Sequence, residues 1–240
     1  MNNVTIVLPC YNEVGNVPIL VSKLRESMPN CEIIVVDDSS PDGTAGVAEN
    51  VGCRVIVRKE RNLGTAIIDG IKAAKTEYVL AMDADLSHRP EDAVRLLSEL
   101  DEGYDLVIGS RFIKGGMYKA PLHRRIITQV GVLPARVFTG IHDTGTGFFA
   151  LNTQRVDVDG VVPMSWKALL EIYARCNVKR VKEVPITFEK RFSGYSKATF
   201  KYFLLNVLHF LYLLASFTLP KFTRETDEAV EAVEVVEGDN

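Results

Sequence analysis

The chain has 240 residues, of which 47% are hydrophobic and 25% are charged, and its formal net charge is −3. This length supplies one sizeable core and leaves little room for a second domain of similar size. The four cysteines lie far apart without a C-x-x-C pair, which argues against a disulfide framework and a zinc site. The N-terminus lacks the basic region and the cleavage site of a signal peptide.

Charge is distributed unevenly along the chain. Seven acidic residues and no basic residue occupy 225–240, which we expect to form a solvated, disordered tail. The rest of the chain is mildly basic, which suits an anionic nucleotide, a phosphate acceptor or an acidic lipid surface. We expect no nucleic acid among the partners.

Short β-branched runs alternate with helical periodicities through the first half of the chain, which predicts repeated βα units. We therefore expect an α/β fold with a mainly parallel, twisted sheet and helices on both faces. The predicted strands are 4–8, 32–36, 54–57, 78–82 and 105–108. Predicted helices begin near Val17, with Asn16 as a possible cap, at Leu63 and at Pro90.

The regular alternation stops after Gly109. Residues 113–121 contain two glycines and a proline with little periodicity, so we expect a mobile loop there. Further strands are predicted at 148–151 and 181–188, and a helix at about 166–174 lies between them.

An apolar segment near the C-terminus, 202–219, has no charged residue across 18 positions, which is the lower limit for a bilayer span. At about 100° per residue, its polar side chains fall on one side and most of its leucines on the other. Basic residues flank both ends, so a helix lying in the membrane interface explains the pattern better than a spanning or a buried helix. We expect a globular domain at 1–198, this helix at 199–222 and the tail at 223–240.

Two carboxylates follow the unbroken apolar run 78–82. Such a run predicts a buried central strand, and ligands of open α/β sheets bind beyond the carboxyl ends of the strands. Asp83 and Asp85 could therefore hold Mg²⁺ or Mn²⁺, which take oxygen ligands and share them with substrate phosphates. A D-x-D sequence alone is a weak signal, because acidic pairs follow many strands.

Two other predicted strands also end in polar side chains. Asp37 and Asp38 follow the run 32–36, where a turn and a helix cap are the simplest interpretation and a contact to a base or ribose is the alternative. The first strand runs into Pro-Cys-Tyr-Asn-Glu at 9–13. Three such ends side by side predict a ligand cleft.

These segments together resemble the family-2 inverting glycosyltransferases of the GT-A fold, and most of all the dolichyl-phosphate mannose synthases and related polyprenyl-phosphate glycosyltransferases. The matching segments follow in order and are 8–13, 35–44, 63–66, 83–91, 109–112 and 183–188. The resemblance implies transfer of a hexose, with mannose from GDP-mannose favoured, to dolichyl or polyprenyl phosphate. The basic residues at both ends of 202–219 favour a location at the cytoplasmic face of a membrane.

The resemblance assigns roles to individual residues. Nucleotide binding would fall to Pro9, Tyr11, Glu13, Asp37, Asp38, Asp83, Ala84, Asp85 and Lys197. The metal would be held by Asp83, Asp85 and Ser87. The acceptor phosphate would contact Arg111, Arg124, Thr128 and Ser196. Catalysis would depend on Asp85, Arg111 and Arg191, and the arginines suit this role because guanidinium groups bind phosphate bidentately.

The chain departs from the family pattern at three points. Ser87 stands where the family often has glutamine, so its shorter side chain leaves a weaker or water-mediated metal contact. Phe149 replaces the arginine of a T-S-G-F-R motif, which removes one phosphate or acceptor contact. The usual basic residue before Leu-Gly-Thr-Ala is displaced, and Lys59 or Arg61 could substitute for it.

An inverting transfer displaces the nucleotide by direct attack on the opposite face of the sugar. A phosphate acceptor needs no general base, because it is already anionic at neutral pH. We accordingly expect His88 and His209 to be structural. The alternatives are a transferase that uses UDP-glucose or a hydroxyl acceptor, and a membrane-associated protein that binds a sugar nucleotide without turnover.

Overall fold

The computed structural model describes residues 3–163, 167–189 and 212. The predicted terminal helix at 199–222, apart from Tyr212, and the tail at 223–240 lie outside these residues. The six helices of the described chain are α1 (Val17–Ser27), α2 (Thr44–Asn50), α3 (Leu63–Ala73), α4 (Pro90–Asp101), α5 (Leu122–Thr139) and α6 (Ala168–Arg175). None of these helices is both long and apolar enough to cross a membrane.

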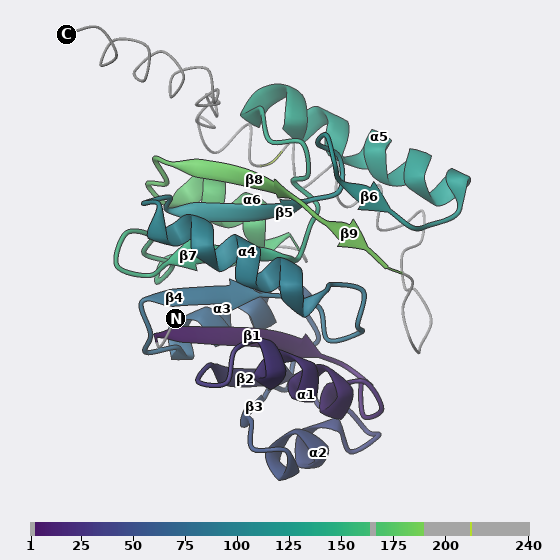
Figure 1. Ribbon diagram of the computed structural model, residues 1–240, viewed down its shortest axis with the longest axis vertical. Helices are drawn as coiled ribbons and strands as arrows, with labels where there is room; N and C mark the ends of the chain where they lie inside the picture. Colours follow the sequence, from purple (N-terminus) through teal and green to yellow (C-terminus); the bar gives the residue numbers. More distant parts are fainter. Residues whose placement is uncertain (1–2, 164–166, 190–211, 213–240) are drawn as a thin grey trace, which may run out of the picture.

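A seven-stranded sheet forms the centre of the molecule (Figure 1). Its strands are β1 (Val4–Cys10), β2 (Glu32–Asp37), β3 (Arg54–Val57), β4 (Tyr78–Ala81), β5 (Leu106–Ser110), β7 (Phe149–Asn152) and β8 (Val181–Pro185). They lie in the order β3-β2-β1-β4-β7-β5-β8, and β7 runs antiparallel to both of its neighbours while all other pairs are parallel. The expected α/β fold with a mainly parallel sheet is therefore confirmed.

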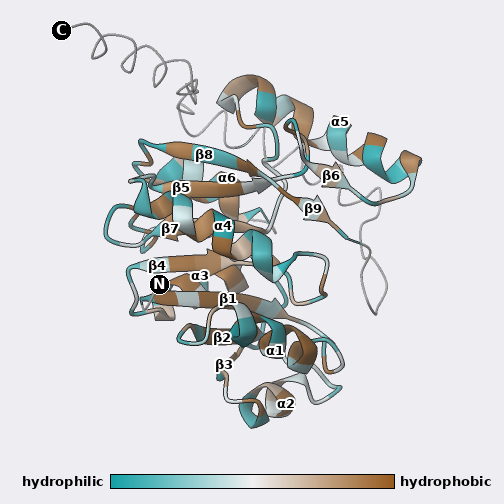
Figure 2. Cartoon of the chain, in the orientation of Figure 1, coloured by the Kyte–Doolittle hydropathy of each residue, from teal (hydrophilic) through white to brown (hydrophobic). Residues whose placement is uncertain are grey.

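Helices cover both faces of this sheet and create two apolar layers. One layer packs α1 and α4 against the sheet through residues such as Leu20 and Leu97, and the other packs α3 and α6 through Ile67 and Ile172. The central strands are correspondingly hydrophobic along most of their length (Figure 2). Because β1 is buried at every position, its apolar run reads as a strand covered on both faces.

The strand order reverses direction between β1 and β4. From β1 the chain builds outward to β2 and β3, and β4 then returns to the other side of β1. Such a switch point opens a crevice beyond the carboxyl ends of the strands, and ligands of open α/β sheets bind there. The ends of β1, β2 and β4 all border this place.

Four local predictions need correction. The strand predicted at 181–188 is split, since β8 ends at Pro185 and β9 (Thr187–Phe188) pairs instead with β6 (Met117–Tyr118). The predicted loop 113–121 therefore contains a strand. Asn16 makes no side-chain capping hydrogen bond to α1: its Nδ2 donates to Glu13 Oε2 at 2.5 Å, and its Oδ1, which would accept from the helix, is buried without a partner among the described residues.

The fourth correction is α5, a helix of 18 residues that the sequence reading did not predict. It contains Gly131 and Pro134, which discourage a helix, and its apolar residues do not all face the core. The helix lies at the top of the molecule in Figure 1, beside the β6–β9 ribbon.

Candidate active site

Three loops that follow β1, β2 and β4 form the floor of the candidate site. Each loop contains one residue other than glycine with a positive φ: Asn12 at 61°, Ser39 at 54° and Leu86 at 63°. Side chains larger than glycine adopt this left-handed conformation at a cost, and such strain gathers where a loop shape serves binding or catalysis. The positive φ angles thus occur after the same three strands whose ends the sequence predicts to bind ligand.

The loops after β1 and β2 are joined by hydrogen bonds. The backbone N–H of Asn12 donates to Ser40 Oγ at 2.9 Å, and that of Glu13 donates to Thr44 Oγ1 at 2.9 Å. The backbone N–H of Val14 also donates to Asp42 Oδ2 at 3.2 Å. These bonds fix the segment with the predicted nucleotide contacts Pro9, Tyr11 and Glu13.

Asp37 and Asp38 are both buried and both brace loops. Asp37 accepts hydrogen bonds from the backbone N–H and the hydroxyl of Ser40, at 2.9 and 2.5 Å. Asp38 binds Arg58 Nη1 at 2.8 Å and the backbone N–H of Asn62 at 3.0 Å. Burial raises the pKa of Asp38, and Arg58 opposes this shift. Both carboxylates thus stabilise the loops that follow β2 and β3. Their contact with a nucleotide stays a prediction.

Arg61 is the displaced basic residue that reaches the cleft. Its guanidinium carbon lies 3.4 Å from the ring centroid of Tyr11, a close cation–π contact between the loop after β3 and the loop after β1. Of the two substitutes that the sequence offers, Arg61 and not Lys59 has a contact of this kind among the described residues. A basic group is thus present beside a predicted nucleotide contact.

The loop after β4 carries the predicted metal ligands. Asp85 is 2% exposed, and its Oδ1 accepts hydrogen bonds from the backbone N–H and the hydroxyl of Ser87, at 3.0 and 2.5 Å. The side chain of Asp83 is 25% exposed. A Cβ added at Gly147 would lie 3.0 Å from Asp83 Oδ1, so a larger residue there would require the Asp83 carboxylate to shift. Ala84 between the two carboxylates is buried.

The buried ring of His88 packs against this loop. Its ring stacks on Phe148 with the centroids 4.5 Å apart and meets the edge of Phe188 at 5.1 Å. The backbone N–H of Asp83 points to His88 Nδ1 at 3.4 Å. Burial lowers the pKa of His88 to about 4, so the imidazole is uncharged at neutral pH. This environment matches the structural role expected for His88.

The oxygen atoms at this loop fit a divalent cation that is shared with substrate. In the described residues no three His, Cys, Asp or Glu side chains gather into a protein-only metal site. Two carboxylates at a strand end suit Mg²⁺ or Mn²⁺, which complete their shells with water and phosphate oxygens. Asp83 and Asp85 would hold the ion, and the Ser87 hydroxyl, which donates to Asp85, orients one of them.

Replacing Ser87 with alanine tests that orienting contact. The variant keeps both carboxylates and loses the hydroxyl that donates to Asp85 Oδ1. We expect the Mn²⁺ concentration for half-maximal activity to rise by about tenfold, because partners of metal ligands typically contribute this much. A metal titration of initial rates measures the shift. An unchanged metal requirement would show that Ser87 neither binds the ion nor orients Asp85.

Arg111 follows β5 and makes a buried ion pair. Its Nε and Nη2 donate to the two carboxylate oxygens of Asp143, each at 2.7 Å, and its backbone N–H donates to the same carboxylate at 3.0 Å. Asp143 raises the pKa of Arg111 although burial opposes this, so the guanidinium stays charged. Asp143 was not predicted as a site residue, because its partner Arg111 lies 32 positions away in the sequence.

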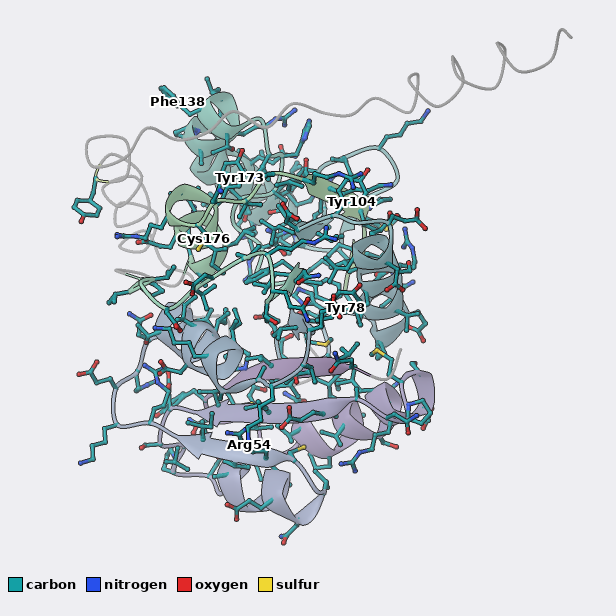
Figure 3. The ribbon with its side chains drawn as sticks, turned by 90° about the vertical axis from the view of Figure 1, so that its left-hand side faces the viewer. Arg54, Tyr78, Tyr104, Phe138, Tyr173 and Cys176 are labelled. Atoms are coloured by element: carbon teal, nitrogen blue, oxygen red, sulfur yellow. The ribbon has the colours of Figure 1, made fainter. Side chains whose placement is uncertain are left out.

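Arg124 and Thr128 lie one turn apart on α5, where the Thr128 hydroxyl donates to the backbone oxygen of Arg124 at 2.9 Å. Both residues are half-buried. The same helix exposes a row of large apolar side chains, and Phe138 projects from its outer surface (Figure 3). This apolar row of α5 comprises Leu122, Ile126, Ile127, Val130, Leu133, Val137 and Phe138.

The remaining predicted residues fall into two groups. Phe149, which replaces the family arginine, is buried in β7 within the apolar layer beside α3 and α6, so position 149 supplies no phosphate contact. Arg191, Ser196 and Lys197 lie outside the described residues.

Comparisons with known proteins agree with the geometry. The model of glycosyl transferase family 2 matches residues 5–158. The dolichol-phosphate mannosyltransferase of Pyrococcus furiosus is 35% identical over 240 residues, which cover 95% of this chain and 66% of that protein. The undecaprenyl-phosphate mannosyltransferase of Micrococcus luteus is 35% identical, over 81% of this chain and 86% of that protein.

A comparison with solved structures shows which fold the chain adopts. Glucosyl-3-phosphoglycerate synthase from Mycobacterium tuberculosis, in complex with Mn²⁺, UDP-glucose and phosphoglyceric acid, matches with a TM-score of 0.69. The match covers 92% of this chain and 81% of that chain at 16% sequence identity. At this identity the likeness shows the fold alone, and it confirms the GT-A-like architecture.

Proposed function

The chain belongs to glycosyltransferase family 2, and from that premise we propose that it transfers a hexose from a sugar nucleotide to a polyprenyl phosphate. Mannose from GDP-mannose is the favoured donor, since the mannosyltransferases of Pyrococcus furiosus and Micrococcus luteus are each 35% identical to this chain. The observation that carries the proposal is the pair Asp83 and Asp85 at the switch point of the sheet, beside the loop after β1, where Tyr11 contacts Arg61 of the loop after β3. The acceptor lipid would be dolichyl or undecaprenyl phosphate.

The donor would bind across the three strand-end loops. Pro9 lies near the end of β1, Tyr11 and Glu13 lie in the loop that follows it, and Arg61 adds a positive charge beside Tyr11. When bound between Asp83 and Asp85, a divalent ion neutralises charge on the departing diphosphate. Arg191 and Lys197 are proposed to contribute further positive charge. The buried, neutral His88 holds the loop in shape and takes no proton at neutral pH.

The acceptor phosphate would approach from the side of α5 and β5. Electrostatic interactions connect this side with the metal loop, since Asp83 contributes to the raised pKa of Arg111. Arg124 and Thr128, with Ser196, are the further proposed phosphate contacts. A phosphate monoester is already anionic at neutral pH, so the attack needs positioning and charge compensation and no general base.

The lipid part of the acceptor would lie along α5 in the membrane surface. The apolar row of α5 faces outward, and Arg125 and Arg136 are exposed on the same helix, where they can meet anionic lipid head groups. A helix with one apolar and one basic side can lie half-sunk in a bilayer surface. We place the enzyme on the cytoplasmic face, with the segment 199–222 as a second membrane contact.

A transfer assay tests the proposal. Purified protein is incubated with dolichyl or undecaprenyl phosphate and with GDP-mannose or UDP-glucose, in Mg²⁺, Mn²⁺ or EDTA, and glycolipid is measured by mass spectrometry. We expect a mannosylated lipid that EDTA abolishes. Product from UDP-glucose alone would reassign the donor. Donor binding without product from any combination would contradict the proposal and leave a non-catalytic sugar-nucleotide-binding protein.

Charged substitutions on α5 test the membrane contact. We expect the double variant Ile126→Glu and Val137→Glu to bind anionic vesicles at least about tenfold more weakly, because each buried aliphatic side chain contributes about 1.5–3 kcal/mol. Co-sedimentation with vesicles of phosphatidylserine and phosphatidylcholine measures the binding. Val162→Glu is the control, since Val162 is 68% exposed and lies outside α5. Equal losses in both variants would remove α5 from the membrane contact.

A further inference from the structure

The Arg111–Asp143 ion pair is buried and has more hydrogen bonds than an ordinary surface ion pair. Asp143 is completely buried, and it binds the guanidinium through both carboxylate oxygens and the backbone of Arg111 through one of them. Removing one partner of a buried pair leaves an uncompensated charge and is strongly destabilising. The pair therefore keeps Arg111 in one orientation.

Asp143 is itself held by a strand of the sheet. The backbone N–H of Asp143 donates to Glu183 Oε1 at 3.1 Å, and the backbone N–H of His142 donates to Glu183 Oε2 at 3.0 Å. Glu183 belongs to β8, where it pairs with Ile108 of β5. A continuous series of contacts thus runs from the sheet through Glu183 and Asp143 to the guanidinium.

Aromatic rings enclose the same guanidinium. The guanidinium carbon of Arg111 lies 5.2 Å from the ring centroid of Phe112, 4.9 Å from Tyr118 and 5.3 Å from Phe188. Phe188 also meets the ring of His88, which stands behind the metal loop. The guanidinium is therefore fixed next to the proposed reaction centre by rings on several sides.

The hydrogen bonds leave one edge of the guanidinium for another anion. In the described chain, the side-chain hydrogen bonds of Arg111 go to Asp143 through Nε and Nη2 only. The Nη1 edge, with its two N–H donors, keeps the capacity to bind an oxyanion. Lys167 lies in the same buried cluster, where burial lowers its pKa to about 8 while Asp143 opposes that shift. With this pKa the ammonium is mostly protonated at neutral pH, so it adds a positive charge near the ion pair.

We infer that Asp143 is a positioning residue that holds Arg111 by one edge and presents the other edge to the acceptor phosphate. This inference rests on the proposed function. Asp143 acts through Arg111 and touches no substrate. Its contribution should therefore disappear when Arg111 is replaced, and it should concern the acceptor and not the donor.

The test compares acceptor and donor binding in matched variants. Calorimetry measures the affinity of the full chain for farnesyl phosphate, a short soluble polyprenyl phosphate, and separately for GDP-mannose with Mn²⁺. We expect Asp143→Asn to weaken farnesyl phosphate binding by about tenfold, as the loss of one charge-assisted contact would. Donor binding should change less than twofold. The double variant Arg111→Gln with Asp143→Asn should bind no more weakly than Arg111→Gln alone.

Asp105→Asn is the matched control. Asp105 is also a buried carboxylate that accepts backbone N–H groups, from Lys179 and Arg180, but it stands at the opposite end of β5. We expect this variant to lose stability and keep both affinities. If Asp143→Asn does not fold, Glu183→Gln replaces it, and we expect a smaller loss that again affects only the acceptor.

Three results would overturn the inference: unchanged or stronger farnesyl phosphate binding in Asp143→Asn, equal losses for acceptor and donor, or a further loss when Asp143→Asn is added to Arg111→Gln. Failure of the proposed function looks different. If the wild-type chain forms no glycolipid but Asp143→Asn still weakens farnesyl phosphate binding selectively, the transfer proposal fails and the positioning role stands.

Discussion

Exchanging Asp85 for asparagine lowers the rate of sugar transfer by about a hundredfold to a thousandfold. The loss follows from the proposed chemistry, since the departing diphosphate needs charge neutralisation, and removing a single stabilising contact of this type commonly costs 10²–10³ in rate. Asparagine retains the side-chain oxygen to which both donors of Ser87 point. The shape of the loop should therefore survive, and only the charge that holds the metal is removed.

Initial rates with Mn²⁺ or Mg²⁺, and the melting temperature of the same samples, measure this effect. Asp105→Asn again serves as the control, because it neutralises a buried carboxylate far from the strand-end loops. We expect the control to melt earlier and to retain its kcat. If Asp85→Asn keeps full activity with either metal ion, Asp85 is not a metal ligand and the proposed mechanism is wrong.

Local patterns predicted the first half of the fold well. The runs that became β1 to β5 are short, apolar and β-branched, and a sheet covered on both faces demands such runs. The polar residues that follow them mark where the strands end. For this reason the sequence predicted that the three loops of Asn12, Ser39 and Leu86 lie together, and in the structure they follow the adjacent strands β1, β2 and β4.

Features that depend on distant partners were not predictable in the same way. Arg111 was assigned through the family resemblance, but its pairing with Asp143, 32 positions away, leaves no local signal in the sequence. The split of β8 from β9 depends on the short pairing of β9 with β6, and two-residue strands carry no periodicity. In α5, apolar residues face outward as well as inward, so the helical pattern is blurred.

The second large effect concerns stability and comes from a glycine inside α3. A Cβ added at Gly70 would lie 2.3 Å from Cγ1 of Val7, closer than packed atoms can approach, and in a tight contact of 3.1 Å with Cγ2 of Val36. The backbone of α3 therefore rests directly on β1 and β2. We expect Gly70→Ala to lower the free energy of unfolding by about 3 kcal/mol, the upper end of the usual cost of overpacking.

Gly46→Ala in α2 is the matched control for Gly70→Ala. Gly46 also lies inside a helix, but a Cβ added there meets nothing within 4 Å. Gly46→Ala should therefore stabilise the protein by about 0.5–1 kcal/mol through helix propensity alone. Urea unfolding at equilibrium measures both variants. Opposite signs would show that contact with Val7 and Val36 determines the result at Gly70. Equal stabilisation would mean that α3 can move away from β1.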